Sequence, residues 1–404
     1  MLMYLYTLTF GIFLNSFVRF PSPILVGLPL IAIFWQSGSF LYTREALLFL
    51  IANFLYYGVA QADLQSVSVN CITIFVCILF FNFFVGLDFG RFKLAVIIFF
   101  SLLILSAIVM LLNHVYPSQI VQLRSKLIGA EIVQSPSGIT STIFNFGYQL
   151  APLVSFLFIA SIMFIDSWIV RIIVLIACLI SIYFGMQRSV LLTFAFSAAI
   201  FLLFYYKYKS VIVIGLTVVI SVVFSTFFIS TSSGEYDNIF AKNDRNAEED
   251  RGNLMTENLN IYADYPLGLM FYGKTWRDVT KYNNVYAGGI TSHNAYLMFI
   301  TYLGPFIGIT LLLLIYYKIG KIFRIALLNI FNREYASLVC LCFSFFSVTL
   351  NAMFHNAWLI GANSASLFLY FAIVHRYNMQ MATEEVKEEI EIKLASSLPV
   401  SLNA

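Results

Sequence analysis

Two short polar motifs in the second half of the sequence contain residue types suited to anion binding and proton transfer. Arg188 stands in the turn at residues 185–189, between two apolar stretches. A guanidinium at the edge of an apolar stretch suits an anion such as a lipid diphosphate, which it can hold with two parallel hydrogen bonds. His293 and Asn294 stand directly before the apolar stretch that begins at Tyr296. Because histidine exchanges a proton near neutral pH, His293 is a candidate to act on a sugar hydroxyl.

The long polar segment at residues 230–295 supplies a third group of charged candidates. Arg245 and Arg251 lie on either side of an acidic run, and two arginines in a segment lying over a membrane can close over a diphosphate. The other candidate substrate-binding side chains of this segment are Lys274, Arg277 and Glu257. His355, between the last two apolar stretches, is a further candidate binding residue.

Each group also has an ordinary structural interpretation. Arg188 can extend toward a phospholipid head group, His293 can cap a helix or bond a neighbouring loop, and charged loop residues are most often simply solvated. The sequence contains no nucleotide-binding glycine loop, zinc spacing or nucleophile elbow. The five cysteines all lie in apolar stretches, so we expect buried thiols and neither a disulfide framework nor a metal site, and we expect no cofactor.

The composition indicates what surrounds these residues. Of the 404 residues, 60% are hydrophobic and 11% are charged, whereas a soluble domain has about 25% charged residues. A soluble fold of this size has no place for so much apolar surface, but a helix bundle facing lipid does. The net charge of +3 is small, and no basic tract indicates a nucleic-acid partner. The sequence therefore predicts an all-α polytopic integral membrane protein in contact with the lipid bilayer.

About twelve stretches approach the length of a membrane helix, which needs about 20 mostly apolar residues. They are residues 2–18, 24–40, 46–60, 69–87, 94–112, 148–165, 169–186, 190–206, 211–229, 296–317, 336–354 and 358–374. Alternate connections carry the basic residues Arg44, Arg91, Lys93, Arg171, Lys207, Lys209, Lys318, Lys321, Arg324, Arg333 and Arg376. The other short connections hold only Arg19 and Arg188. Because basic connections face the cytoplasm, we expect both termini inside and the Arg188 turn outside.

Two long connections then fall on the outer side of the transmembrane domain, which we assign to residues 1–376. They are a smaller loop at 113–147 and a large loop at 230–295, between the ninth and tenth spans. In the large loop we expect a helix over residues 248–262 that ends before Pro266 and Gly268. Its expected apolar contacts are Leu254, Leu259, Ile261 and Tyr262. Residues 377–404 are expected to form a charged, mobile cytoplasmic tail.

These motifs, taken in order, resemble the O-antigen ligase and O-antigen polymerase superfamily of bacterial envelope polysaccharide synthesis. Members have about twelve spans and one large periplasmic loop late in the chain, preceded by an arginine in a short outer turn. The matching residues here are Gln187, Arg188 and Ser189 in the turn, Arg251 and residues 265–269 in the loop, and residues 293–297 with Gly304 and Gly308 after it. The resemblance covers about residues 148–377 and departs at Ser189, where the family usually has glycine.

The resemblance implies a metal-independent glycosyltransferase with a GT-C-like membrane fold, located in the bacterial inner membrane with its active site facing the periplasm. The donor would be a glycan on undecaprenyl diphosphate. Arg188 and Arg251 would stabilise charge on the leaving diphosphate, and His293 would orient or deprotonate the acceptor hydroxyl. A polymerase, which we favour, uses the next lipid-linked repeat unit as the glycan acceptor and has a chain-length regulator as an additional candidate partner.

Two alternatives remain open at this stage. An O-antigen ligase would transfer the same lipid-linked glycan to lipid A core. A polytopic carrier or flippase is the alternative from another class. Carriers often show internal repeats and ionisable residues at the centres of their spans. This chain shows no internal repeat and almost no ionisable residue at the centre of a span.

Overall fold

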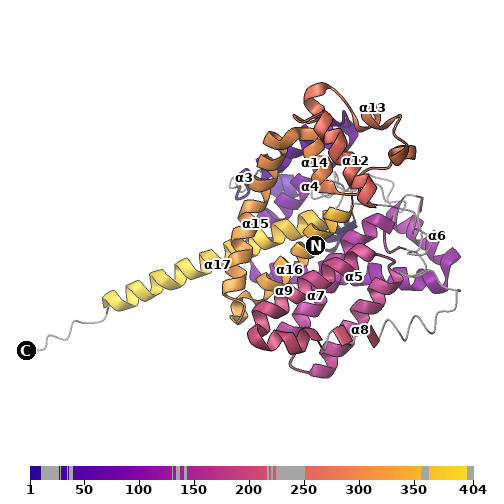
Figure 1. Cartoon of the computed structure of the whole chain (residues 1–404). Coiled ribbons are helices and arrows are strands. Elements are labelled where there is room, and N and C mark those ends of the chain that lie inside the picture. Colours follow the sequence, from indigo (N-terminus) through magenta and orange to yellow (C-terminus); the bar gives the residue numbers. More distant parts are fainter. Residues whose placement is uncertain are drawn as a thin grey trace, which may run out of the picture.

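The structure, a computed structural model, describes residues 1–10, 27, 29–33, 35, 40–129, 131–132, 137–140, 143–215, 218–219, 222–223, 251–355 and 364–397. Within these residues the chain is all-helical, with 14 α-helices (Figure 1). Six helices of the described part are long and apolar enough to cross a membrane: Leu64–Val85, Phe89–Val115, Asn145–Phe164, Arg188–Gly215, Ala295–Leu328 and Arg333–Phe354. These helices are those of a multi-pass membrane protein.

The count of about twelve spans stays a prediction. The helix Trp168–Phe184 is apolar but shorter than the six long ones. The spans expected at residues 2–18, 24–40, 211–229 and 358–374 lie partly outside the described residues.

The N-terminal part of the chain forms α1 (Leu2–Phe10), α3 (Thr43–Asn53), α4 (Leu64–Leu79) and α5 (Phe89–Val115). Short π-helical segments, Phe54–Ala60 and Phe80–Val85, extend α3 and α4. Aspartates begin two of these helices. The Asp63 carboxylate accepts a hydrogen bond from Ser66 N at 3.0 Å, and Asp88 accepts one from Arg91 N at 3.1 Å. Each carboxylate thus pairs a backbone N–H that the first turn of a helix leaves unsatisfied.

The segment after α5 is held together by one buried arginine. Arg124, in α6 (Pro117–Ile128), is fully buried. Its guanidinium donates to Gly138 O at 2.8 Å, to Thr140 O at 2.9 Å and to Asn113 Oδ1 at 3.0 Å. Burial lowers the pKa of Arg124 to about 10, so the group is still charged at neutral pH. The described part of the 113–147 loop is therefore folded around a cation that the sequence analysis did not single out.

Replacing Arg124 by methionine is expected to destabilise this loop by about 2–5 kcal/mol, because several buried acceptors lose their donor at once. Methionine keeps the length and apolar volume of the side chain but offers no N–H group. The matched control is Lys126→Met, which removes one exposed cation two residues away on the same helix. Hydrogen exchange of the α6 amides, followed by mass spectrometry, measures the difference. Equal exchange in both variants would contradict the role given to Arg124.

The second half of the bundle is built around α16 (Ala336–Asn351). This helix packs against α7 (Ile143–Phe164), α9 (Arg188–Tyr206), α15 (Thr310–Leu328) and α17 (Ser364–Ser397), while α8 (Trp168–Phe184) packs on α7. Small hydroxyl side chains join the helices: Ser344 donates to Pro152 O at 2.9 Å, and Ser197 donates to Phe343 O at 3.2 Å. In lipid, helices associate through close packing and interhelical hydrogen bonds of this kind.

The large polar loop, where it is described, forms an ordered layer at one end of the bundle (Figure 1). It contains α12 (Arg251–Asp264), the 3-10 segment Leu269–Tyr272, α13 (Trp276–Thr280) and the 3-10 segment Asn284–Gly289. The helix expected at residues 248–262 is present as α12, with residues 248–250 outside the described part. Leu254 and Ile261 are buried as expected. The expectation for Leu259 is wrong, because 46% of its surface is exposed on the opposite face of the helix.

The loop layer rests on α14 (Ala295–Gly304), which continues through the π-helical segment Pro305–Ile309 into α15. Asn258 of α12 accepts a hydrogen bond from Thr301 Oγ1 at 2.7 Å. At Gly304 the two backbones touch: a Cβ there would overlap Leu267 O, and a Cβ on Gly268 would overlap Gly304 N. Both glycines also have positive φ, 76° and 98°, which side-chain-bearing residues rarely adopt. The two glycines that the sequence singled out therefore form one contact between loop and helix.

The bundle has two chemically different ends. The basic end carries Arg91, Lys93, Arg171, Lys207, Arg324, Arg333 and Arg376; the loop end carries Asp63, His114, Arg188, Asn294 and His355. At the loop end His114 Nε2 lies 2.9 Å from Phe184 O, which joins the ends of α5 and α8. At the basic end Arg376 donates to Glu334 O at 2.8 Å. The alternation of basic and non-basic connections in the sequence therefore corresponds to two ends of the folded bundle.

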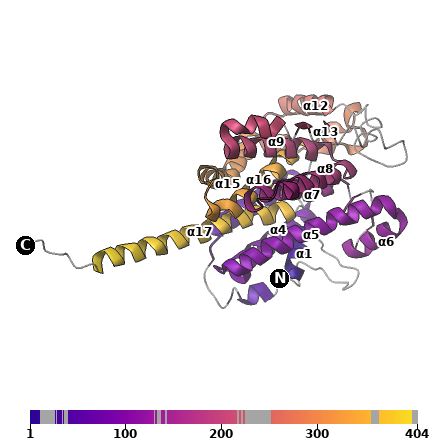
Figure 2. The same ribbon diagram turned by 90° about the horizontal axis from the view of Figure 1, so that it is seen from below.

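The C-terminal tail expected to begin at residue 377 is not separated from the last helix, and its expected mobility stays a prediction. The helix α17 continues unbroken to Ser397, and its second half projects away from the bundle (Figures 1 and 2). Residues 377–397 contain neither Pro nor Gly and are rich in Glu and Lys, which are good helix formers. The expected boundary at residue 376 therefore lies inside one helix.

Candidate functional site

The Arg188 turn at the loop end is a tight connection between α8 and α9. A side chain on Gly185 would lie 2.7 Å from Ser181 O and from Leu150 Cδ2, so the turn needs glycine at this position. Met186 follows with φ of 53°, in the left-handed region that is unfavourable for methionine. Gln187 is the buried residue that precedes α9, and the half-buried Arg188 is the first residue of that helix.

His355 joins this turn from 166 residues away. Its Nε2 atom lies 3.0 Å from Ser189 Oγ, and both side chains are only 4% exposed. The His355 ring also lies against Tyr148 of α7, with 5.6 Å between ring centroids. The structure thus brings together two candidates that the sequence could place only on the same side of the membrane, the Arg188 turn and His355.

Gly147 of α7 provides the room for this arrangement. A Cβ at Gly147 would lie 3.2 Å from Gln187 Oε1, 3.4 Å from Asn351 Nδ2 and 3.4 Å from His355 Nε2. Polar atoms from the turn, from the last residue of α16 and from His355, which follows the 3-10 segment Ala352–Phe354, therefore converge on one point of α7. We call Gly147, Tyr148, Gln187, Ser189, Asn351 and His355 the loop-end cluster.

Asn351 and Tyr148 of the loop-end cluster have buried polar atoms without a hydrogen-bond partner within the described part of the chain. They are the amide nitrogen and oxygen of Asn351, which is fully buried, and the hydroxyl of Tyr148, which is 2% exposed. Buried polar atoms are rarely left unpaired, because each one loses its bonds to water. Groups of this kind, gathered at the Arg188 turn, fit a site that receives a polar ligand or ordered water.

The His293–Asn294 motif borders the same helix end. Asn294 is the N-cap of α14, and its Oδ1 accepts a hydrogen bond from Leu297 N at 3.0 Å. Tyr296 then donates to Thr349 O at 2.9 Å, which ties the first turn of α14 to the last turn of α16. The half-buried His293 itself has a φ of 51°, a strained backbone conformation for a residue other than glycine. Asn294 thus has a structural role, and His293 is held in place beside it.

The charged candidates of the large loop have different surroundings. Glu257 accepts hydrogen bonds from Asn283 Nδ2 at 2.8 Å and from Asn260 Nδ2 at 2.9 Å, so it ties the loop layer together. Lys274 and Arg277 are exposed on the loop. Arg251 begins α12, but its side chain and the whole of Arg245 lie outside what the structure describes. The binding roles of Arg245, Arg251, Lys274 and Arg277 therefore stay predictions.

Sequence reasoning missed Tyr148 and Asn351, and it used Gln187 and Ser189 only as parts of the Arg188 motif. One signal was readable: Asn351 and His355 are four residues apart at the end of an apolar stretch, a spacing that predicts one face of a helix, although His355 follows the helix end in the structure. No spacing or motif in the sequence distinguishes Tyr148 from the other tyrosines of the chain, which has 24 in all.

The described residues contain no group of three His, Cys, Asp or Glu side chains that could hold a metal ion. In the comparisons with known proteins, no protein-family model matches the chain, and no curated protein or solved structure matches it either.

Proposed function

We propose that the chain is a membrane glycosyltransferase that joins lipid-diphosphate-linked oligosaccharides, with its site at the loop end of the bundle. The observation that carries the proposal is the hydrogen bond between Ser189 and His355, which places the Arg188 turn within a buried polar cluster. In this proposal the protein lies in a bacterial inner membrane, the loop end faces the periplasm and both termini are cytoplasmic. The donor is then already activated by its diphosphate, so the reaction needs no nucleotide on the outer side of the membrane.

The proposed step is a displacement at the anomeric carbon of the donor sugar. An acceptor hydroxyl oxygen forms a bond to that carbon, while the bond from the carbon to the diphosphate oxygen breaks and the diphosphate leaves with the electron pair. Arg188, with Arg251 from the loop, counters the charge that develops on the leaving group. The imidazole of His293 receives the proton of the acceptor hydroxyl.

The loop-end cluster positions these groups in the proposed mechanism. His355 is nearly fully buried and its bond to Ser189 fixes the first turn of α9, so it acts through the Arg188 backbone. Asn351 and Tyr148 supply polar atoms that a sugar or a bridging water satisfies on binding. The aromatic residues of the loop layer cover the acceptor and hold it in line with the donor.

The test uses the purified full-length chain in lipid nanodiscs, with a lipid-linked repeat unit as the only substrate and products separated by size. A ladder of longer lipid-linked chains is expected. Transfer only after lipid A core is added would assign a ligase, and no transfer to either acceptor would remove the enzyme assignment in favour of a carrier.

Arg188→Ala is expected to lower the transfer rate by about 10²–10³-fold, the usual effect of removing one group that stabilises transition-state charge. The control is Arg324→Ala, which removes an exposed arginine at the opposite, basic end of the bundle. Both variants should insert and fold alike, because Arg188 is half-buried at a helix start. A wild-type rate in Arg188→Ala would exclude Arg188 from the site.

A further inference from the structure

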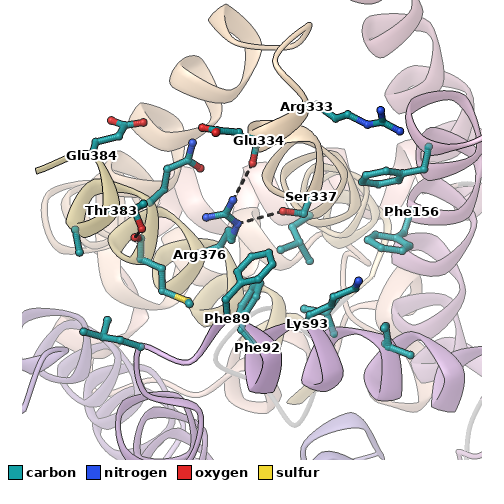
Figure 3. A pocket seen from close by; sticks show the side chains of 18 residues that line it. Phe89, Phe92, Lys93, Phe156, Arg333, Glu334, Ser337, Arg376, Thr383 and Glu384 are labelled. Atoms are coloured by element: carbon teal, nitrogen blue, oxygen red, sulfur yellow. Dashed lines mark hydrogen bonds between the residues drawn. The ribbon is translucent and has the colours of Figure 1, made fainter. Parts of the chain in front are cut away.

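The basic end of the bundle, far along the helices from the loop end, contains a cavity. The cavity, of about 850 Å³, lies between the start of α5, the end of α7, the start of α16 and residues 376–384 of α17 (Figure 3). Its walls are mainly apolar, with Phe92, Phe156 and Leu341 among the lining residues. This volume is within the usual range for sites that bind small molecules, about 300–1,000 Å³.

The rim of the cavity carries both signs of charge, with a small excess of positive charge. The described residues that line it include three cations, Lys93, Arg333 and Arg376, and two carboxylates, Glu334 and Glu384. Lys93 and Arg333 are exposed; in the view of Figure 3 Arg333 lies above Ser337 and Lys93 lies below it. Arg376 is only 7% exposed, and its two hydrogen bonds go to uncharged oxygens, Ser337 Oγ at 3.2 Å and Glu334 O at 2.8 Å. The rim therefore suits an anion.

A buried amide in the lining points to the same kind of ligand. Gln380 lines the cavity and is 4% exposed, yet neither its Nε2 nor its Oε1 has a hydrogen-bond partner among the described residues. Burying an amide without partners is unfavourable. An amide in this state beside a basic rim fits a ligand that brings oxygen atoms of its own.

The depth of the cavity indicates that the ligand is amphiphilic. On α5 the lining extends from Phe89 to Ile97, which at 1.5 Å per residue is about 12 Å along the helix. This wall is part of the candidate membrane span Phe89–Val115, and Phe156 of α7 is part of another, Asn145–Phe164. Half of the hydrocarbon core of a bilayer is about 15 Å thick. The apolar wall thus matches the upper part of an acyl chain that descends from a head group at the rim.

We propose that this cavity binds an anionic phospholipid of the surrounding leaflet. The phosphate lies at Lys93 and Arg333, a glycerol or ester oxygen pairs with the Gln380 amide, and one acyl chain runs along Phe92, Phe156 and Leu341. Basic pockets between membrane helices commonly hold anionic lipid head groups. The proposal does not depend on the transferase activity, because the two sites lie at opposite ends of the bundle.

The experiment measures which lipid stays bound to the full-length chain. The protein is reconstituted in vesicles of equal phosphatidylglycerol and phosphatidylcholine and then released into mild detergent. Retained lipids are identified by native mass spectrometry. We expect phosphatidylglycerol to be retained in preference, and Lys93→Gln with Arg333→Gln to lower the preference by about fivefold for each cation removed. The charge-matched control is Lys321→Gln with Arg324→Gln, on α15 at the same end but outside the cavity lining.

Two further arms decide what is bound. Gln380→Leu should lower phosphatidylglycerol retention while the lipid-depleted protein becomes more stable, since an unpaired amide is replaced by an apolar side chain. Unchanged retention in this variant would overturn the proposal. Millimolar inorganic phosphate should displace no lipid; displacement by phosphate would show a simple anion site. Equal loss in the cavity variant and its charge-matched control would show only a general attraction of the basic end to anionic membranes.

Discussion

Replacing Gly304 by alanine is expected to release the large loop from the helix bundle. The new methyl group would overlap the Leu267 carbonyl oxygen, so one of the two backbones must move. Alanine would also have to adopt a φ of 76°, which alone is unfavourable by about 1–2 kcal/mol. With the overpacking added, we expect the docked state of the loop to be destabilised by about 2–5 kcal/mol. The fraction of open loop then rises at least about 30-fold.

Hydrogen exchange of peptides from residues 251–294, measured in nanodiscs by mass spectrometry, reports this opening directly. Gly268→Ala should behave like Gly304→Ala, since its Cβ would overlap Gly304 N. The control is Gly273→Asn in the same loop. Gly273 also has positive φ, 59°, but a Cβ there meets nothing within 4 Å, and asparagine tolerates this conformation. If all three variants exchanged alike, the glycine contact would not be what anchors the loop.

Replacing His293 by glycine should abolish transfer while leaving the fold intact. The proposed function makes the imidazole the acceptor of a proton, and the loss of such a group lowers a rate by about 10²–10⁴-fold. Glycine is the informative replacement because His293 has a φ of 51°. His293→Ala would keep the strain, whereas His293→Gly removes the imidazole and relieves it. The rate is measured in the same ladder assay as for Arg188.

Added imidazole provides the decisive arm of this experiment. Because His293→Gly leaves space where the ring was, free imidazole should restore part of the rate in this variant and have no effect on the wild-type protein. Ala62→Gly is the matched control, since Ala62 is an exposed residue with φ of 55° at the same end of the bundle. It should show the wild-type rate. Wild-type transfer by His293→Gly without imidazole would exclude the proposed role.

The sequence was sufficient to predict the class of fold and the separation of the chain into two polar ends. Long apolar stretches predict membrane-spanning helices. Lys and Arg residues concentrate in every second connection between these stretches, which predicts that those connections share one end of the bundle. It could not predict that α16 lies at the centre of the second half. That position depends on small side chains such as Ser344, whose contact with Pro152 joins residues 192 apart. It also missed the continuation of α17, because the charged residues after Arg376 were expected to form a mobile tail, although they favour helix.

The candidate site was predictable in its parts and not in its assembly. Arg188 and His355 stand out as polar residues beside apolar stretches, but only the folded chain places His355 on Ser189. Carboxylates were harder to interpret, because the sequence around a charged loop residue does not distinguish one that binds a ligand from one that pairs with a neighbouring side chain. Glu257 is an example: the sequence offered it as a ligand-binding group, and the structure shows it bonded to two asparagines.

The unbroken course of α17 has a mechanical consequence. With 34 residues the helix is a rod about 51 Å long. It contains no proline or glycine at which it could bend freely. Its first half is packed inside the bundle, where Phe368 and Phe371 are fully buried. The angle at which the second half emerges is therefore determined by aromatic packing deep in the bundle rather than by the charged residues of the tail itself. Because the helix is stiff, a small tilt of its buried first half displaces the C-terminal end of the helix by a much larger distance.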